Sequence, residues 1–172
     1  MSRSLTDVVP GLLVPAAWTV TLLAHLGTVS RRTLLIALVV MDVLLVAFAV
    51  ASRDEMTGPV LRLWQRVLLV GLVATVAGTA DLAFRLGGML ALGTLFVWMV
   101  VPGVAYLLTG RAVPTPGYRR AYFGGGALSL GGAVVYALEP AGLAGEAAVV
   151  AGLALVGVGQ TAGILAAVVQ NG

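Results

Sequence analysis

The chain has 172 residues, of which 60% are hydrophobic and only 10% are charged, and its mean hydropathy is +1.06. An average soluble domain has about 25% charged residues, so this composition excludes a soluble globular protein and predicts an integral membrane protein. All ten basic residues are Arg, and the chain has no Lys, no Cys and a single His, which excludes Lys Schiff bases, thiolate chemistry, disulfides and bis-His haem ligation within it.

Apolar runs of about 20 residues, the length needed to cross a bilayer, recur along almost the whole chain. They predict an all-α fold class, a polytopic membrane helix bundle in one integral membrane domain over residues 1–172. The six predicted transmembrane helices lie near 9–30, 33–52, 60–84, 89–109, 119–138 and 143–169. The fifth span depends on reading its glycines as close-packing residues, which lipid tolerates better than water does.

The arginines predict how these spans are oriented. With six spans, seven arginines fall on the side of the two termini: Arg3, Arg53, Arg62, Arg66, Arg111, Arg119 and Arg120. Only Arg31, Arg32 and Arg85 fall on the opposite side. The positive-inside rule therefore favours a cell-membrane protein with both termini in the cytoplasm, although the adjacent Arg31 and Arg32 oppose it.

The first predicted span carries His25 near its outer end. Imidazole titrates near neutral pH, so His25 is a candidate proton relay toward the second span. The structural alternative is a hydrogen bond from His25 to a neighbouring helix.

Asp42 lies at the centre of the second predicted span. A carboxylate at that depth costs about 2.5 to 3.5 kcal/mol on insertion scales, so the group must be protonated, paired or facing a cavity. Asp42 is therefore the leading candidate for a proton-binding group. The structural alternative is a protonated carboxyl group that hydrogen-bonds a Thr or a backbone carbonyl of a neighbouring helix.

The third predicted span ends with Asp81 and Arg85, which are four residues apart. Residues at this spacing share one helix face, so the pattern predicts a structural ion pair near the outer surface. An extracellular gate or a substrate contact is the functional alternative.

Two polar features of the fourth and sixth spans lie at a depth similar to that of Asp42. Pro102 cannot donate the hydrogen bond that the carbonyl of Trp98 normally accepts, which predicts a break of the kind that binds ions in transporters, or a packing kink. Gln160 is a further intramembrane polar candidate, and a lone Gln at this depth also serves to bridge helices.

Small residues at four-residue spacing form two ridges, one with Gly125 and Ser129 on the fifth span and one with Gly159 and Gly163 on the sixth. Such ridges predict close packing of these helices, either with each other or with another subunit. A homo-oligomer or a partner membrane protein is therefore a candidate partner.

A weak sequence similarity between the halves of the chain suggests a 3+3 inverted repeat, as many transporters have. Trp18, Ala24-His25 and Arg31-Arg32 recur in order as Trp98, Ala105-Tyr106 and Arg119-Arg120, and Ala77–Ala80 resembles Val158–Ala162.

The leading functional hypothesis is a small secondary transporter or proton-coupled carrier, because of the intramembrane polar groups around Asp42. The alternative is a non-catalytic membrane subunit that scaffolds or anchors partner proteins. A third is a membrane enzyme acting on a lipid or isoprenoid, although no catalytic residue can be named for it. We expect the lipid bilayer as a partner, and no cofactor, metal or nucleic acid.

Overall fold

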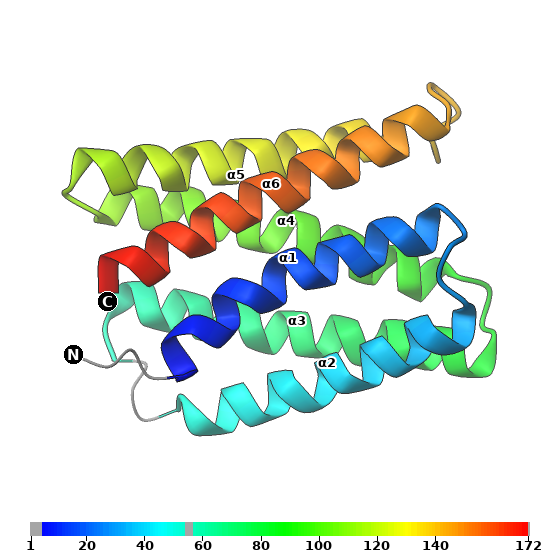
Figure 1. Ribbon diagram of the computed structural model, residues 1–172, viewed down its shortest axis with the longest axis horizontal. Helices are drawn as coiled ribbons and strands as arrows, with labels where there is room; N and C mark the ends of the chain where they lie inside the picture. Colours follow the sequence, from blue (N-terminus) through cyan, green and yellow to red (C-terminus); the bar gives the residue numbers. More distant parts are fainter. Residues whose placement is uncertain (1–4, 54–56, 172) are drawn as a thin grey trace. The chain divides into compact units, whose positions relative to one another are not determined.

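The computed structural model describes residues 5–53 and 57–171, and this part of the chain is helical apart from its turns (Figure 1). Its six helices are α1 (Leu5–His25), α2 (Arg31–Ala51), α3 (Pro59–Phe84), α4 (Met89–Ala112), α5 (Pro116–Ala137) and α6 (Glu146–Asn171). The all-α fold class is confirmed, and each helix lies within five residues of a predicted span.

The turns explain where the helices begin and end. The largest difference from the predicted spans is in α1, which ends at His25 because Gly27 adopts φ +70° and turns the chain. Ser30 then caps α2, its side-chain oxygen accepting a hydrogen bond from the backbone N–H of Thr33 at 3.1 Å. Pro59 and Pro116 stand in the first turns of α3 and α5, where no N–H donor is required.

Four helices in the described residues are long and apolar enough to cross a membrane, namely α2, α3, α4 and α6. The apolar part of α1 that can be assessed, Gly11–His25, is shorter, and α5 is not among the four. These helices identify a membrane protein, with fewer unambiguous spans than the six predicted from the sequence.

The chain divides into two compact units, and the boundary lies inside α4. Unit 1 contains α1, the part of α4 from Pro102 onward, α5 and α6, whereas unit 2 contains α2, α3 and the part of α4 up to Val101. This division does not fall between α3 and α4, where a simple 3+3 arrangement divides the chain. The inverted repeat remains a prediction.

In unit 1 the helices α5 and α6 run side by side, with α1 against α6 (Figure 1). Glycines allow the backbones of α5 and α6 to approach closely. A Cβ atom placed on Gly125 would lie 2.6 Å from the carbonyl oxygen of Gly159, and one on Gly132 would lie 2.6 Å from that of Gly152. The small residues of the fifth span therefore serve close packing between α5 and α6.

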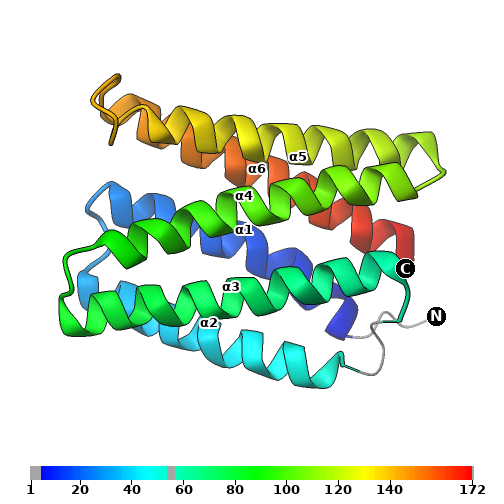
Figure 2. The same cartoon turned by 180° about the vertical axis from the view of Figure 1, so that it is seen from behind.

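In unit 2 the helix α2 packs beside α3, as the reverse view in Figure 2 also shows. The first half of α4 packs on α3 at two glycines, with the Trp98 ring over Gly71 and the Thr94 side chain over Gly78. The other face of α2 exposes large apolar residues, as expected for a helix surrounded by lipid: Ile36, Val39, Val40, Val43, Val46 and Val50.

Candidate functional site

Asp42 lies midway along α2 and reaches the neighbouring helix α3. The hydroxyl Oγ1 of Thr79 donates a hydrogen bond of 2.7 Å to Oδ2 of Asp42. The side chains of both residues are partly buried in unit 2. The structural interpretation of Asp42 predicts this hydrogen bond with a Thr of a neighbouring helix.

The second carboxyl oxygen of Asp42 lacks such a partner. Oδ1 is buried and accepts or donates no hydrogen bond among the described residues. A buried polar atom without a partner costs about 1–3 kcal/mol, and native proteins satisfy nearly all such atoms. A bridge between α2 and α3 requires only Oδ2, the oxygen that Thr79 contacts. It does not explain why Oδ1 is buried without a partner.

Near the same depth of unit 2, Trp98 is fixed by α3. Its indole Nε1 donates a hydrogen bond of 2.8 Å to Oγ1 of Thr75, and that hydroxyl donates in turn to the carbonyl of Gly71 at 2.8 Å. The predicted break at Pro102 does not divide α4, which continues as one helix from Met89 to Ala112. Trp98 is thus a packing residue between α4 and α3.

Gln160 bridges helices in unit 1. Its side-chain oxygen accepts a hydrogen bond of 3.0 Å from Nε1 of Trp18, and its amide nitrogen donates one of 2.9 Å to Oγ of Ser129. The hydroxyl of Tyr106 donates to its backbone carbonyl at 3.0 Å. Gln160 is only 4% exposed, so it is the centre of a buried polar network that joins α1, α4, α5 and α6.

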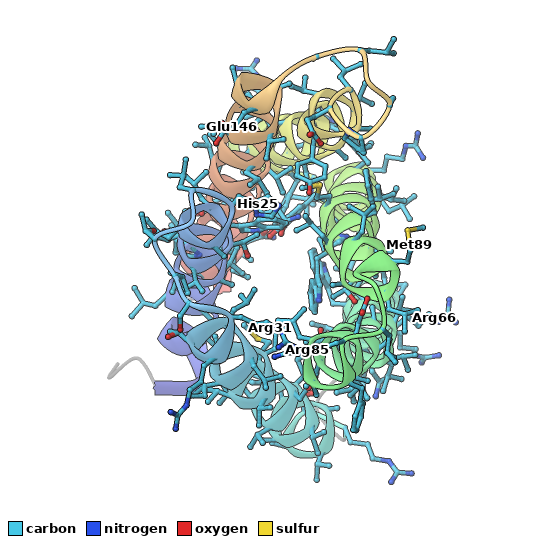
Figure 3. All side chains as sticks on the ribbon, turned by 90° about the vertical axis from the view of Figure 1, so that its right-hand side faces the viewer. His25, Arg31, Arg66, Arg85, Met89 and Glu146 are labelled. Atoms are coloured by element: carbon cyan, nitrogen blue, oxygen red, sulfur yellow. The ribbon has the colours of Figure 1, made fainter. Side chains whose placement is uncertain are left out.

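His25, labelled in Figure 3, also contacts a neighbouring helix. Its Nε2 lies 3.0 Å from the hydroxyl of Tyr136 on α5, and its Nδ1 lies 2.9 Å from the carbonyl of Thr21. The two aromatic rings meet edge to face at 5.7 Å. His25 belongs to unit 1 and Asp42 to unit 2, so a proton relay between them remains a prediction.

Asp81 and Arg85 take roles other than the expected ion pair. The Asp81 carboxylate accepts three backbone N–H groups at the start of α4, from Gly88 at 2.9 Å, Leu90 at 2.8 Å and Ala91 at 2.9 Å. Arg85 terminates α3 in the left-handed conformation, with φ 56° and ψ 51°. A residue in that conformation has left the helix, so the side-chain spacing that would pair it with Asp81 is lost.

The glycine ridges of α5 and α6 are used within the chain. Gly125 contacts the backbone of Gly159, and Ser129 contacts Gln160. Gly163 lies under the ring of Tyr106, where an added Cβ would be 2.5 Å from a ring carbon. The sequence predicted that these ridges pack either on each other or on another subunit, and in the structure they pack on each other.

Sequence reasoning did not identify the partners of these groups. Thr79, Thr75 and Tyr136 carry the decisive contacts of Asp42, Trp98 and His25. Hydroxyl groups are common in apolar helices, and nothing in their spacing distinguishes the ones that bridge helices.

No protein-family model, curated protein or solved structure matches the chain.

Proposed function

We propose that the chain is a small proton-coupled secondary transporter that crosses the cell membrane six times and binds its proton at Asp42. The observation that carries this proposal is the buried, unpartnered Oδ1 of Asp42 in the middle of an apolar helix. An intramembrane carboxyl group is retained at considerable cost, and in known membrane proteins such groups mark proton and substrate pathways.

In this proposal the two carboxyl oxygens of Asp42 have different roles. Thr79 donates to Oδ2, which makes Oδ2 the acceptor of the pair and leaves Oδ1 as the site for an exchangeable proton. Protonation neutralises the group, and deprotonation creates an anion that apolar surroundings disfavour. Such a carboxyl group couples its charge state to the arrangement of the helices around it.

Packing within unit 1 supports counting α1 and α5 among the spans. Both helices pack on α6, which is itself long and apolar enough to cross a membrane. α5 has 22 residues, or roughly 33 Å at 1.5 Å per residue, so it matches the thickness of a hydrocarbon core. Its lower apolarity comes from its glycines and tyrosines and from Arg119 and Arg120 in its first turns.

The proposed orientation depends on unit 1. Its described arginines Arg111, Arg119 and Arg120 all lie at one end, and Glu139 and Glu146 lie at the other. Unit 2 has three arginines at each end and does not contribute to the asymmetry. Under the positive-inside rule the arginines of unit 1 alone favour an orientation with both termini in the cytoplasm.

Matching tryptophan contacts in the two units support the inverted repeat. Trp18 of α1 packs on Gly157 of α6 and donates to Gln160, one turn further along. Trp98 of α4 packs on Gly71 of α3 and donates to Thr75, also one turn further along. In a 3+3 repeat α1 corresponds to α4 and α6 to α3, so the two contacts are equivalent, with the first helix of each half packed on the third helix of the other.

The transport proposal is tested with purified protein in liposomes under an imposed pH gradient. A panel of labelled amino acids, sugars, nucleosides and carboxylic acids is screened for gradient-driven uptake. We expect uptake of at least one class, which the Asp42→Asn variant loses. The Thr161→Val variant is the matched control and keeps this uptake, because Thr161 is a half-buried polar residue of α6 in unit 1, whereas Asp42 lies in unit 2.

Two results contradict the proposal. One is gradient-driven uptake that persists in Asp42→Asn, and the other is the absence of uptake for every class in a protein that remains folded. The second result favours the scaffolding hypothesis, which then requires a partner on a surface other than the α5 and α6 ridges, because those ridges are covered within the chain.

A further inference from the structure

Three exposed arginines lie at one end of unit 2, Arg31 and Arg32 at the start of α2 and Arg85 at the end of α3. In the proposed orientation this end faces away from the cytoplasm. The positive-inside rule therefore does not account for them, and they call for another explanation.

Arg31 and Arg85 converge on the last turn of α3. The guanidinium Nη2 of Arg31 donates a hydrogen bond to the backbone carbonyl of Leu82, three residues before Arg85. Figure 3 shows the labelled side chains of Arg31 and Arg85 next to each other at this end of the unit. Two cationic groups are thus held at one helix end.

The backbone at Arg85 favours glycine. Arg85 is the one residue other than glycine with a positive φ in the described part of the chain, and it lies in the left-handed region. Glycine is the usual residue at this position of a helix end, because a side chain there is strained. The presence of Arg at a strained position indicates that its side chain serves a purpose other than ending the helix.

Among the described residues, no carboxylate forms an ion pair with Arg31 or Arg85. Asp81 is the nearest acidic residue along the chain, yet it is 2% exposed and its two oxygens accept three backbone N–H groups. In the described part of unit 2, neither Arg31 nor Arg85 forms an ion pair, and Arg85 makes no side-chain hydrogen bond. Two guanidinium groups so placed repel each other unless an anion lies between them.

Exposed apolar side chains lie close to Arg85 in the sequence. Phe84 is 74% exposed, Leu86 57% and Met89 74%, and all three lie within four residues of Arg85. In a bilayer these side chains contact acyl chains, while the guanidinium forks match the oxygens of a phosphate group. Arg85 and its sequence neighbours Phe84 and Leu86 therefore offer the two kinds of contact that a phospholipid requires.

We propose that Arg31 and Arg85 form a site for a phosphate-type oxyanion, supplied by the headgroup of an anionic lipid. The Asp81 carboxylate acts as a positioning group, because its three hydrogen bonds fix the turn that carries Arg85. The proposal does not depend on transport, since none of these residues contacts Asp42.

The experiment measures lipid retention by native mass spectrometry of detergent-purified protein mixed with phosphatidylglycerol or phosphatidylcholine. We expect a preference for phosphatidylglycerol that falls by about tenfold in Arg85→Gln and in Arg31→Gln, the size of one lost charge-assisted contact. Arg66→Gln is the matched control. It removes an exposed arginine from the opposite end of unit 2 and should leave the preference unchanged.

Two further arms complete the test. Arg85→Gly relieves the backbone and keeps the fold, so its loss of phosphatidylglycerol cannot be attributed to unfolding. The second arm measures whether inorganic phosphate stabilises the protein relative to chloride at equal ionic strength. If phosphate stabilises the wild type but not Arg85→Gly, and the wild type shows no lipid preference, the site binds a soluble oxyanion. The site is refuted if Arg66→Gln weakens lipid retention as much as Arg85→Gln, or if neither lipid nor phosphate distinguishes wild type from Arg85→Gly.

Discussion

Thr79 and Asp42 join α3 to α2 through a hydrogen bond of 2.7 Å that uses only one of the two carboxyl oxygens. The other oxygen is buried and has no hydrogen-bond partner in the described residues. Asp42 either bridges α2 to α3 as a purely structural group or exchanges a proton during function, and these alternatives differ in chemical behaviour.

The first prediction concerns the reactivity of Asp42. A protonated carboxyl group in an apolar helix reacts with hydrophobic carbodiimides, which act on the acid form. We expect dicyclohexylcarbodiimide to modify the wild-type protein at Asp42, with less modification as the pH is raised. Mass spectrometry of α2 peptides measures this. Equal modification at all pH values where the protein is folded would mean that the proton does not exchange.

The second prediction concerns the buried network of unit 1. Gln160→Leu preserves volume but leaves the Trp18 donor and the Ser129 acceptor without their partner. We expect it to lower the free energy of unfolding by about 2 kcal/mol, from two lost interhelical bonds and the groups left unsatisfied. Unfolding titrations in mixed micelles measure this change.

Thr161→Val is the matched control for Gln160→Leu. It changes a half-buried polar residue of the same helix, so its effect should stay within about 0.5 kcal/mol. If the two substitutions have equal effects, Gln160 is not the centre of the network.

The third prediction uses two adjacent glycines of α5. A methyl group on Gly125 would meet the carbonyl oxygen of Gly159 at 2.6 Å, whereas one on Gly124 meets nothing within 4 Å. Gly125→Ala should therefore lose about 1–3 kcal/mol of stability, as overpacked cores do, while Gly124→Ala remains neutral or becomes slightly more stable. Equal losses would show that α5 and α6 do not pack through this face.

The fourth prediction distinguishes the turn-capping role of Asp81 from the ion pair expected from the sequence. Arg85→Gly should be as stable as the wild type or more stable by about 1 kcal/mol, because glycine adopts the left-handed conformation without strain. Asp81→Ala should be clearly destabilised, because three backbone donors lose their acceptor. If both variants lower the free energy of unfolding by a similar amount, Asp81 and Arg85 stabilise the protein as an ion pair, contrary to this account.

Much of this architecture was predictable because bilayer thickness fixes the length of an apolar helix. The prediction of 60–84 for the third span agrees with Pro59–Phe84 to one residue, since Gly58-Pro59 marks its start. The prediction failed at Arg85, where a four-residue spacing implies an ion pair only if the helix continues. The sequence Phe84-Arg85-Leu86 does not predict that Arg85 adopts the left-handed conformation and ends the helix.

The candidate site was only partly predictable for a similar reason. The cost of burying a carboxyl group singles out Asp42 from the sequence alone. Its partner depends on the rotation of α2 against α3, which many small packing contacts decide together. Thr75 and Thr79 lie one turn apart on α3, yet one bonds Trp98 and the other Asp42.

The most direct test of the central claim is an infrared pH titration of the protein in lipid bilayers, comparing wild type with Asp42→Asn. If Asp42 exchanges its proton, the wild-type spectrum contains a carboxylic-acid C=O band whose intensity changes reversibly between acidic and alkaline buffer. This band should be absent from Asp42→Asn. A band assigned to Asp42 that does not change between these buffers would contradict the account and leave Asp42 as a structural bridge to Thr79.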